Sequence, residues 1–228
     1  MSGPLLAGLG LGVSFGETAA LEDVSLSLSA GEVVAVMGTS GSGKSTLLHC
    51  LAGVLVPDRG EVSFAGERID NQSDRRRSDL RLRSFGFVPQ FGDLVPELTL
   101  LENVALPLRL LQVGRREATG RAAALLDELE VGSAASRRAG AASGGQVQRA
   151  AVARALVHCP SVVFADEPTG ALDSATGELV LEALVATARD RGSAVLLVTH
   201  EAVVASHADR EVVVRDGRLD LLAFPTVG

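Results

Sequence analysis

The stretch VVAVMGTSGSGKSTLLH, residues 33–49, decides the fold of this chain. Five mostly apolar residues, Val33 to Met37, are followed by a glycine-rich turn, and a helical pattern starts at Lys44. The turn matches G-x-x-x-x-G-K-[ST], the phosphate-binding loop, in the strand–loop–helix context that the pattern requires. Glycines let main-chain N–H groups converge on a phosphate, and the positive end of the following helix points to the same place. The stretch predicts a nucleotide-binding α/β fold.

The residue types of this loop assign a role to each position. Lys44 is expected to reach the β- and γ-phosphates, and the Ser45 hydroxyl to bind Mg²⁺. Lys44 is also the only lysine among 21 Lys and Arg residues, which indicates a place where a slim ammonium is needed. A glycine-rich turn with an incidental surface lysine is the less favoured alternative. The candidate nucleotide-binding residues are Gly38, Thr39, Ser40, Gly41, Ser42, Gly43, Lys44, Ser45 and Thr46.

Composition limits the class of protein. The chain has 228 residues, of which 46% are hydrophobic and only 3% aromatic, so we expect an aliphatic core. A formal net charge of −7 argues against a nucleic-acid partner, which would require a basic surface. Cys50 and Cys159 lie far apart in apolar stretches and are interpreted as small buried side chains without a disulfide. Because no apolar run is long enough for a membrane span and residues 4–13 lack a basic region before them, we expect a cytoplasmic chain.

Hydrophobic patterns outline the rest of the chain. Short strands are expected within residues 9–36, where Val24, Leu26 and Leu28 alternate with serines, and a helix from Lys44 to about Val54. The charged run 74–83 is interpreted as a solvated helix face, with contact to anionic lipid or to a partner that seeks basic residues as the alternative. Further strands and hairpins are predicted at 61–69 (turning at Ala65-Gly66), 85–89, 162–165, 194–199 and 211–222 (turning at Asp216-Gly217), and a helix at 175–189. Residues 91–155 show helical periodicity and are interpreted as a helical subdomain inserted into the core.

Three apolar strands of the parallel type end at Gly38, Asp166 and His200. Ligands of such sheets bind beyond the carboxyl ends of the strands, so these residues are expected to converge on one site. Asp166 is a candidate Mg²⁺ ligand, because an acid at the end of a buried strand is otherwise costly. Glu167 is placed to orient or deprotonate the attacking water, and His200 to donate a hydrogen bond to the γ-phosphate.

Ser143-Gly144-Gly145 opens a strongly helix-forming run and is a second candidate anion site. The alternative, a helix N-cap with flexible glycines, is disfavoured by the neighbouring nucleotide motifs. One γ-phosphate does not need two helix N-termini from one chain, which indicates a site shared by two subunits.

Five motifs together resemble an ATP-binding cassette (ABC) ATPase: the phosphate loop, Gln90, ASGGQVQRAAVARAL (142–156), VVFADEPTGALDS (162–174) and LLVTH (196–200). The resemblance covers nearly the whole chain in the order and spacing of the family. It implies an α/β fold, a P-loop NTPase core with a mainly parallel sheet, an N-terminal antiparallel β subdomain and an inserted α-helical subdomain. We therefore expect one ABC ATPase domain over 1–228, with 1–90 and 156–228 as the nucleotide-binding core and 91–155 as the helical subdomain.

The resemblance also implies roles for residues. Glu167 is implied as the catalytic base, with His200 sensing the γ-phosphate and Asp166 supporting Mg²⁺. Gln90 is implied to contact the metal and to couple the site to the helical subdomain. Ser143, Gly144, Gly145 and Gln146 are implied to close over the γ-phosphate that is bound to the other subunit. Asp173 is implied to lie in the loop across the dimer interface, and Phe15 to stack on adenine in place of the usual tyrosine. The implied cofactors are ATP and Mg²⁺.

Residues 87–108 further resemble the branch that serves lipoprotein release, macrolide export and cell division. The implied partners are a second copy of the chain, in a head-to-tail ATP sandwich, and an integral membrane permease, which would hold the chain at the inner face of the membrane. A signalling regulator of a cell-wall enzyme is an open alternative. A DNA-repair or translation cassette is disfavoured, since the chain has one cassette and no coiled-coil insertion. Ala142 and Val147 depart from the family pattern, which affects the expected tightness of dimer closure.

Overall fold

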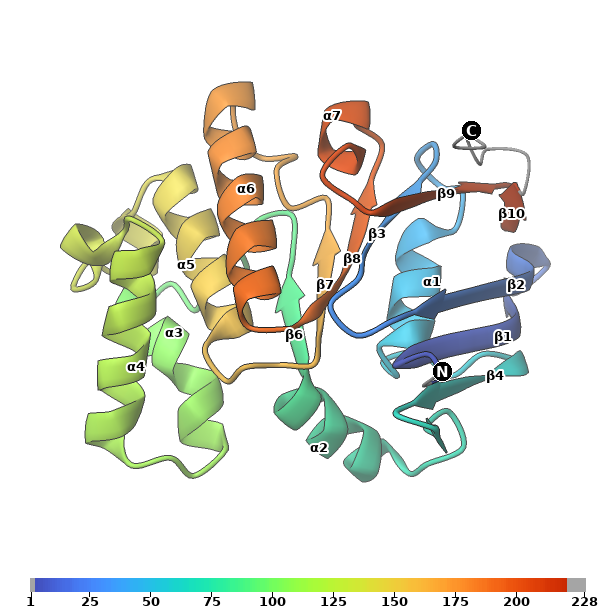
Figure 1. Cartoon of the computed structure of the whole chain (residues 1–228), viewed down its shortest axis with the longest axis horizontal. Coiled ribbons are helices and arrows are strands. Elements are labelled where there is room, and N and C mark those ends of the chain that lie inside the picture. Colours follow the sequence, from blue (N-terminus) through green and yellow to red (C-terminus); the bar gives the residue numbers. More distant parts are fainter. Residues whose placement is uncertain (1–2, 221–228) are drawn as a thin grey trace. The chain divides into compact units, whose positions relative to one another are not determined.

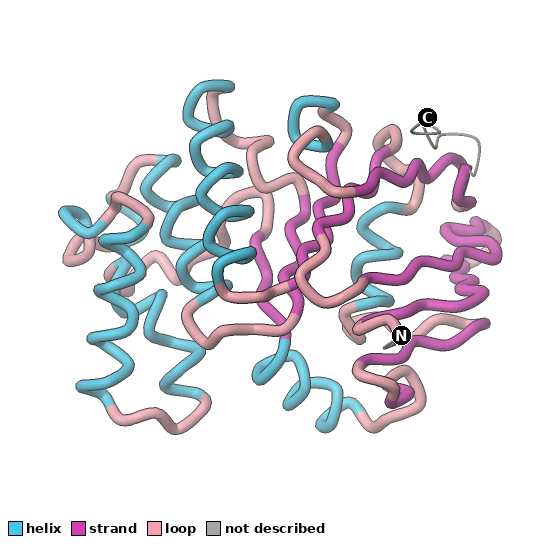
Figure 2. The backbone as a smooth tube through the Cα atoms, viewed as in Figure 1, coloured by secondary structure: helices cyan, strands magenta, loops and turns pink. Residues whose placement is uncertain are grey.

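The computed structural model describes residues 3–220, which form two compact units. Unit 1 contains the described residues up to Arg81 and those from Ala194 onward, and unit 2 is Leu82–Ser193. Figure 1 labels the elements, and Figure 2 shows that unit 1 consists mostly of strands and unit 2 mostly of helices. The predicted α/β fold class is confirmed.

Unit 1 begins with an antiparallel sheet in the order β2-β1-β4-β5. Its strands are β1 (Leu6–Phe15), β2 (Thr18–Leu28), β4 (Arg59–Phe64) and β5 (Glu67–Arg68). The predicted alternation holds in β2, where Val24, Leu26 and Leu28 are buried and the serines between them are exposed. The prediction of short strands from residue 9 is wrong, because β1 starts at Leu6 and β1 and β2 are 10 and 11 residues long, paired with three shifts in register.

The second sheet of unit 1 carries the phosphate loop. Within this unit its order is β10-β9-β3-β8, and β3 (Val33–Met37) runs parallel to both β8 (Ala194–Thr199) and β9 (Arg210–Arg215). All of β8 and the first four residues of β3 are buried, which explains their continuous apolar sequence. The strand β10 (Arg218–Asp220) closes the predicted hairpin at Asp216-Gly217; Leu221 and Leu222 lie outside the described residues.

One helix of unit 1, α1 (Lys44–Leu51), differs in part from expectation. It ends before the predicted Val54, because Gly53 adopts a left-handed φ of 63°. The Gly53 N–H donates to the Cys50 carbonyl, and the Val54 N–H donates to the His49 carbonyl. These two hydrogen bonds form a Schellman motif. α7 is a single turn, Ala202–Ala205.

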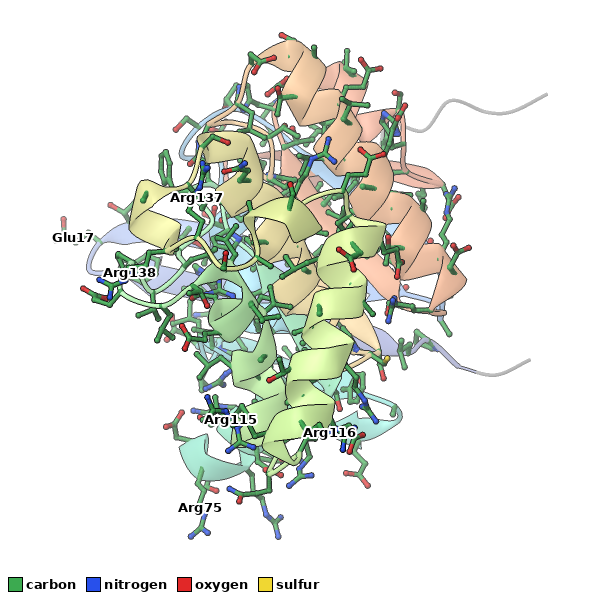
Figure 3. All side chains as sticks on the ribbon, turned by 90° about the vertical axis from the view of Figure 1, so that its left-hand side faces the viewer. Glu17, Arg75, Arg115, Arg116, Arg137 and Arg138 are labelled. Carbon is green, nitrogen blue, oxygen red and sulfur yellow. The ribbon has the colours of Figure 1, made fainter. Side chains whose placement is uncertain are left out.

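The helix α2 (Asp74–Ser84) buries none of its residues, in agreement with a solvated face. Figure 3 shows Arg75 projecting away from it. Arg77 and Arg81 instead turn back, and their guanidinium groups donate to the carbonyl of Gly53 at 3.2 and 2.6 Å. They hold the end of α1 to α2.

Unit 2 contains the parallel pair β6 (Phe85–Val88) and β7 (Val162–Asp166). Its helices are α3 (Leu100–Leu110), α4 (Arg115–Glu128), α5 (Gly144–Leu156) and α6 (Ser174–Asp190), with 3-10 turns η1 (Gly132–Ala134) and η2 (Ala139–Ala141). Residues 91–155, all described, form no strand, only an isolated bridge between Thr99 and Arg138. The helical periodicity of this segment is thus observed, and its division from the core at 91 and 155 stays a prediction.

The two cysteines have different surroundings. Both are free, as predicted, and Cys50 in α1 is buried. The expectation that Cys159 is buried is wrong, because it follows the end of α5 in a left-handed conformation (φ 54°) that leaves it exposed. Burial raises the pKa of the Cys50 thiol to about 12, with a further contribution from Asp58. Among residues 3–220, no helix has the length and apolarity to cross a membrane.

Candidate active site

The phosphate loop of unit 1 depends on glycines at two close approaches. Gly38 (φ 151°) and Gly43 (φ 106°) adopt conformations that L side chains rarely take. A Cβ atom on Gly38 would lie 2.3 Å from the carbonyl oxygen of Val214, and one on Gly43 would lie 2.4 Å from that of Ala20. Since both obstacles are main-chain atoms, the loop can follow this path only with glycine at these positions.

The start of α1 is open to an anion. Gly43 is its N-cap, and no side chain of the described residues caps it, so the first-turn N–H groups lack that partner. Thr39, Ser40, Gly41 and Ser45 are exposed, which leaves the crest of the loop and the Ser45 hydroxyl accessible. This arrangement fits the phosphates of a nucleotide.

Lys44 lies inside the loop that carries it. Its side chain is 5% exposed, and its Nζ donates to the carbonyl oxygens of Gly38 and Thr39, both at 2.8 Å. The loop therefore orients the ammonium group before any phosphate is bound. The two other predicted site residues of unit 1 are exposed: Phe15 at the end of β1, 57% exposed, and His200 directly after β8.

The predicted acids of unit 2 lie at the end of β7. Asp166 is the last residue of the strand, and Glu167 follows in a left-handed conformation with a φ of 45°. A non-glycine residue in that conformation is strained, and such strain is concentrated at functional sites. The bend directs the Glu167 carboxylate to Gln90, whose Nε2 donates to Oε2 at 3.3 Å. Gly170 leaves room for this contact, since a Cβ there would lie 2.8 Å from the same Nε2.

Ser143 is the N-cap of α5 and forms a capping box with Gln146. The Gln146 N–H donates to its hydroxyl at 3.3 Å, and the Ser143 N–H donates to Gln146 Oε1 at 3.1 Å. The disfavoured N-cap interpretation is therefore correct for Ser143 in this conformation. The anion site stays a prediction, and the exposure of Ser143 and Gly144 is compatible with it.

Asp173 is likewise the N-cap of a helix. It accepts a hydrogen bond from the Thr176 N–H at 3.0 Å, at the start of α6. That hydrogen bond, the largest cause, lowers the pKa of Asp173. The exposed carboxylate is therefore fixed in direction and ionised.

Sequence reasoning missed Gln148 of α5, which is 2% exposed. Its Nε2 donates to the carbonyls of Pro89 and Pro168, at 3.0 and 2.7 Å. The available signal was its position: it precedes Ala151, Val152 and Ala155 on the buried face of the helix, where a polar side chain needs partners.

The candidate metal ligands are few, and all of them are oxygen donors. Within residues 3–220, no three His, Cys, Asp or Glu side chains form a metal-binding group. The candidate ligands are oxygens: the Ser45 hydroxyl in unit 1, and the Asp166 carboxylate and Gln90 amide in unit 2. Mg²⁺ is commonly held by one or two carboxylates, water and substrate phosphates, so this donor set fits it. The convergence of both units on one nucleotide stays a prediction.

Comparison with known proteins identifies the family. The model of the family described as "ABC transporter" matches residues 21–170. The lipoprotein-releasing system ATP-binding protein LolD 2 of Caulobacter vibrioides is 43% identical over 225 residues, covering 97% of this chain and 99% of the relative. LolD of Bordetella pertussis is 44% identical over 222 residues, covering 96% of each. The predicted resemblance to the lipoprotein-release branch is confirmed.

A solved structure agrees with these relatives. The ATP-binding cassette MJ0796, solved as a dimer in a post-hydrolysis state bound to ADP and Pi, is 36% identical in sequence to this chain. The two structures superpose with a TM-score of 0.85, and the match covers 94% of this chain and 96% of the MJ0796 chain. The chain therefore belongs to the ABC transporter family, as a cassette that binds and hydrolyses ATP.

Proposed function

We propose that this ATPase drives an integral membrane permease of the lipoprotein-release type by ATP-induced pairing of two copies. The observation that carries the proposal is the likeness, over nearly the whole chain, to ATP-binding proteins of lipoprotein-releasing systems. The catalytic motifs are complete, because the phosphate loop, both acids, the histidine and the serine at the start of α5 are all present.

In unit 1, the loop from Gly38 to Thr46 binds the phosphates of ATP. The N–H groups at the start of α1 and the Lys44 ammonium stabilise the negative charge of the β- and γ-phosphates, and the Ser45 hydroxyl would be a ligand of Mg²⁺. His200 donates to the γ-phosphate. Phe15 offers an exposed aromatic face for adenine at the end of β1.

In unit 2, Asp166 and Gln90 would hold Mg²⁺, and Glu167 is the general base that orients and deprotonates water. Gln90 also holds Glu167 through its amide. A bound Mg²⁺ would supply charge neutralisation for the leaving phosphate oxygens. Residues 91–155 serve as the inserted helical subdomain that carries Ser143, and 1–90 with 156–228 as the nucleotide-binding core.

The ATP site is shared by two copies. The signature segment, Ser143, Gly144, Gly145 and Gln146, closes over the nucleotide of the other copy, and Asp173 lies at the interface between them. The exposed start of α5 supports this role, as does the dimeric state of the related cassette MJ0796. The assembled chain then lies on the cytoplasmic side of the membrane, held by the permease.

The partner is tested by isolating the tagged chain from detergent-solubilised membranes of its own organism. We expect an integral membrane protein with few spanning helices and a large extracytoplasmic domain to copurify. A membrane partner that instead carries a cell-wall enzyme outside would favour the signalling alternative. Copurification of soluble proteins alone would contradict the proposal.

The shared site is tested by mixing two inactive variants, Lys44→Ala and Ser143→Arg. Each homodimer has both sites broken, whereas the mixed dimer has one complete site and one that is doubly broken. We expect ATPase activity to reappear on mixing, at up to about half the wild-type value per dimer if the sites act independently. No recovery in a confirmed heterodimer would contradict independent shared sites.

A further inference from the structure

We infer that Gln148 is a positioning residue that links the signature helix α5 to both Gln90 and Glu167. The inference rests on the roles proposed for those two residues. In the proposed mechanism Gln148 touches neither the nucleotide nor the attacking water. It acts through the main chain next to Gln90 and Glu167.

The contacts of Gln148 define the link. Its single amide nitrogen donates one N–H to the Pro89 carbonyl at 3.0 Å and the other to the Pro168 carbonyl at 2.7 Å. Pro89 directly precedes Gln90, and Pro168 directly follows Glu167. One buried group thus fixes the main chain next to both residues, whose own side chains meet at 3.3 Å.

The Pro168 carbonyl depends most on this donor. Gln148 is 2% exposed and Pro168 is buried, so removing the amide leaves that acceptor without solvent to replace it, whereas Pro89 is half-buried. The Pro89 carbonyl also accepts the Gly92 N–H at 3.3 Å, and the Glu167 carbonyl accepts the Gly170 N–H at 3.1 Å. These two main-chain hydrogen bonds close the turns that carry Gln90 and Glu167. Both lie at or directly beside the Pro89 and Pro168 carbonyls that Gln148 binds.

A second side chain of α5 strengthens the link to the Gln90 loop. Arg154 donates to the carbonyls of Gly92 and Asp93 at 3.0 and 2.8 Å. Val147 lies against the same loop, since a Cβ on Gly92 would be 2.7 Å from its Cγ1. The helix that starts with the signature segment thus holds the loop after Gln90 at several points.

The arrangement gives a path from the signature segment to the catalytic base. A shift of α5 displaces the Pro89 and Pro168 carbonyls together, and with them Gln90 and Glu167. Because misplacement of a catalytic group by about 1 Å costs on the order of 100-fold in rate, small shifts suffice. Gln148 thereby couples engagement of the signature segment to the position of the water-activating carboxylate.

The test replaces Gln148 by methionine, which keeps length and volume and removes both donors. We expect kcat to fall about 10-fold, with the ATP Kd within roughly 2-fold of wild type, because the phosphate loop is untouched. Asn103→Leu is the matched control. Asn103 is also fully buried and its Nδ2 donates to the carbonyls of Val95 and Thr99, both at 3.0 Å; neither residue adjoins Gln90 or Glu167 in the chain.

Hydrogen exchange of the nucleotide-free protein supplies a readout without catalysis. We expect Gln148→Met to speed exchange in peptides covering both 88–93 and 166–171, which include the Gly92 and Gly170 amides, and Asn103→Leu to leave both unchanged. Wild-type kcat in a folded Gln148→Met protein would overturn the inference. So would a loss of kcat without faster exchange in both peptides, or the same exchange in the control.

If Gln148→Met does not fold, Gln148→Asn applies the same criteria with a milder change, since its amide is one methylene too short to reach both carbonyls. A failure of the proposed function can be distinguished from a failure of this inference. Should Glu167→Gln keep its turnover, the role of Glu167 is wrong, whereas the exchange experiment still tests the physical link.

Discussion

The phosphate loop of unit 1 and the turn after β7 in unit 2, which carries Glu167, are built from different kinds of contact. The loop is fixed by main-chain atoms: Gly38 and Gly43 approach carbonyls of Val214 and Ala20, and Lys44 donates to carbonyls of the loop itself. The turn after β7 is fixed by side-chain amides, with Gln90 holding Glu167 and Gln148 holding the main chain beside both.

This difference has a consequence for mutations. A loop fixed by main-chain contacts tolerates most side-chain changes but not an added Cβ, and damage to it appears as lost ATP binding. A turn fixed by amides tolerates an added Cβ better but not a lost donor, and damage to it appears as lost turnover with binding retained.

The largest expected effect in unit 2 is that of Glu167→Gln. Removing the proposed base should reduce turnover by at least about 10²–10³-fold and leave ATP binding intact, because Lys44 and the loop are unchanged. The variant should accumulate as an ATP-bound dimer in size-exclusion chromatography. The control is Glu178→Gln, on the exposed face of α6. Near wild-type hydrolysis by Glu167→Gln would remove Glu167 from the role.

In unit 1, Gly43→Ala should act on binding. The new Cβ would lie 2.4 Å from the Ala20 carbonyl oxygen, so the loop must move, and we expect ATP affinity to fall at least about 10-fold. Gly31→Ala is the matched control, since its φ of 72° is also left-handed and nothing lies within 4 Å of the added atom. It should lose about 1 kcal/mol of stability and keep the wild-type Kd. Equal Kd values in titrations of the two variants would contradict the main-chain account.

A smaller effect is expected from Gly170→Ala in unit 2. Its Cβ would lie 2.8 Å from Gln90 Nε2, and the flexible amide can move away at the cost of its contact with Glu167. We expect kcat to fall roughly 2- to 5-fold with ATP binding unchanged, as for the loss of one weak hydrogen bond. Gly120→Ala, in open space on α4, should keep kcat and raise the melting temperature. A wild-type kcat in Gly170→Ala would show that the Gln90–Glu167 contact does not influence the rate.

The same difference explains what the sequence could predict. The phosphate loop, the buried strands β3, β7 and β8, and the helix start at Lys44 could be predicted because each has a local pattern: a glycine motif, a continuous apolar run or the first residues of a helix. The bond between Gln90 and Glu167 joins residues 77 positions apart, and the role of Gln148 depends on carbonyls 59 and 20 positions away. Such contacts leave no local pattern.

Two errors have equally physical causes. The exposure of Cys159 depends on the left-handed turn after α5, which an apolar neighbourhood does not reveal. The early end of α1 depends on Gly53, which the apolar run through Val54 concealed.

The central claim is that the loop around Lys44 binds the phosphates of ATP, and the single lysine allows a direct measurement. Apart from the α-amino group, Lys44 is the one primary amine in the sequence, so an amine reagent has one side-chain target. Its apo reactivity should be modest, because Nζ already donates to two carbonyls and the side chain is 5% exposed. Labelling is measured by peptide mass spectrometry with the N-terminus as internal control. We predict that saturating Mg·ATP sharply lowers labelling of Lys44 and that prior modification abolishes nucleotide binding. Unchanged labelling of Lys44 in a chain shown to bind ATP would contradict the account.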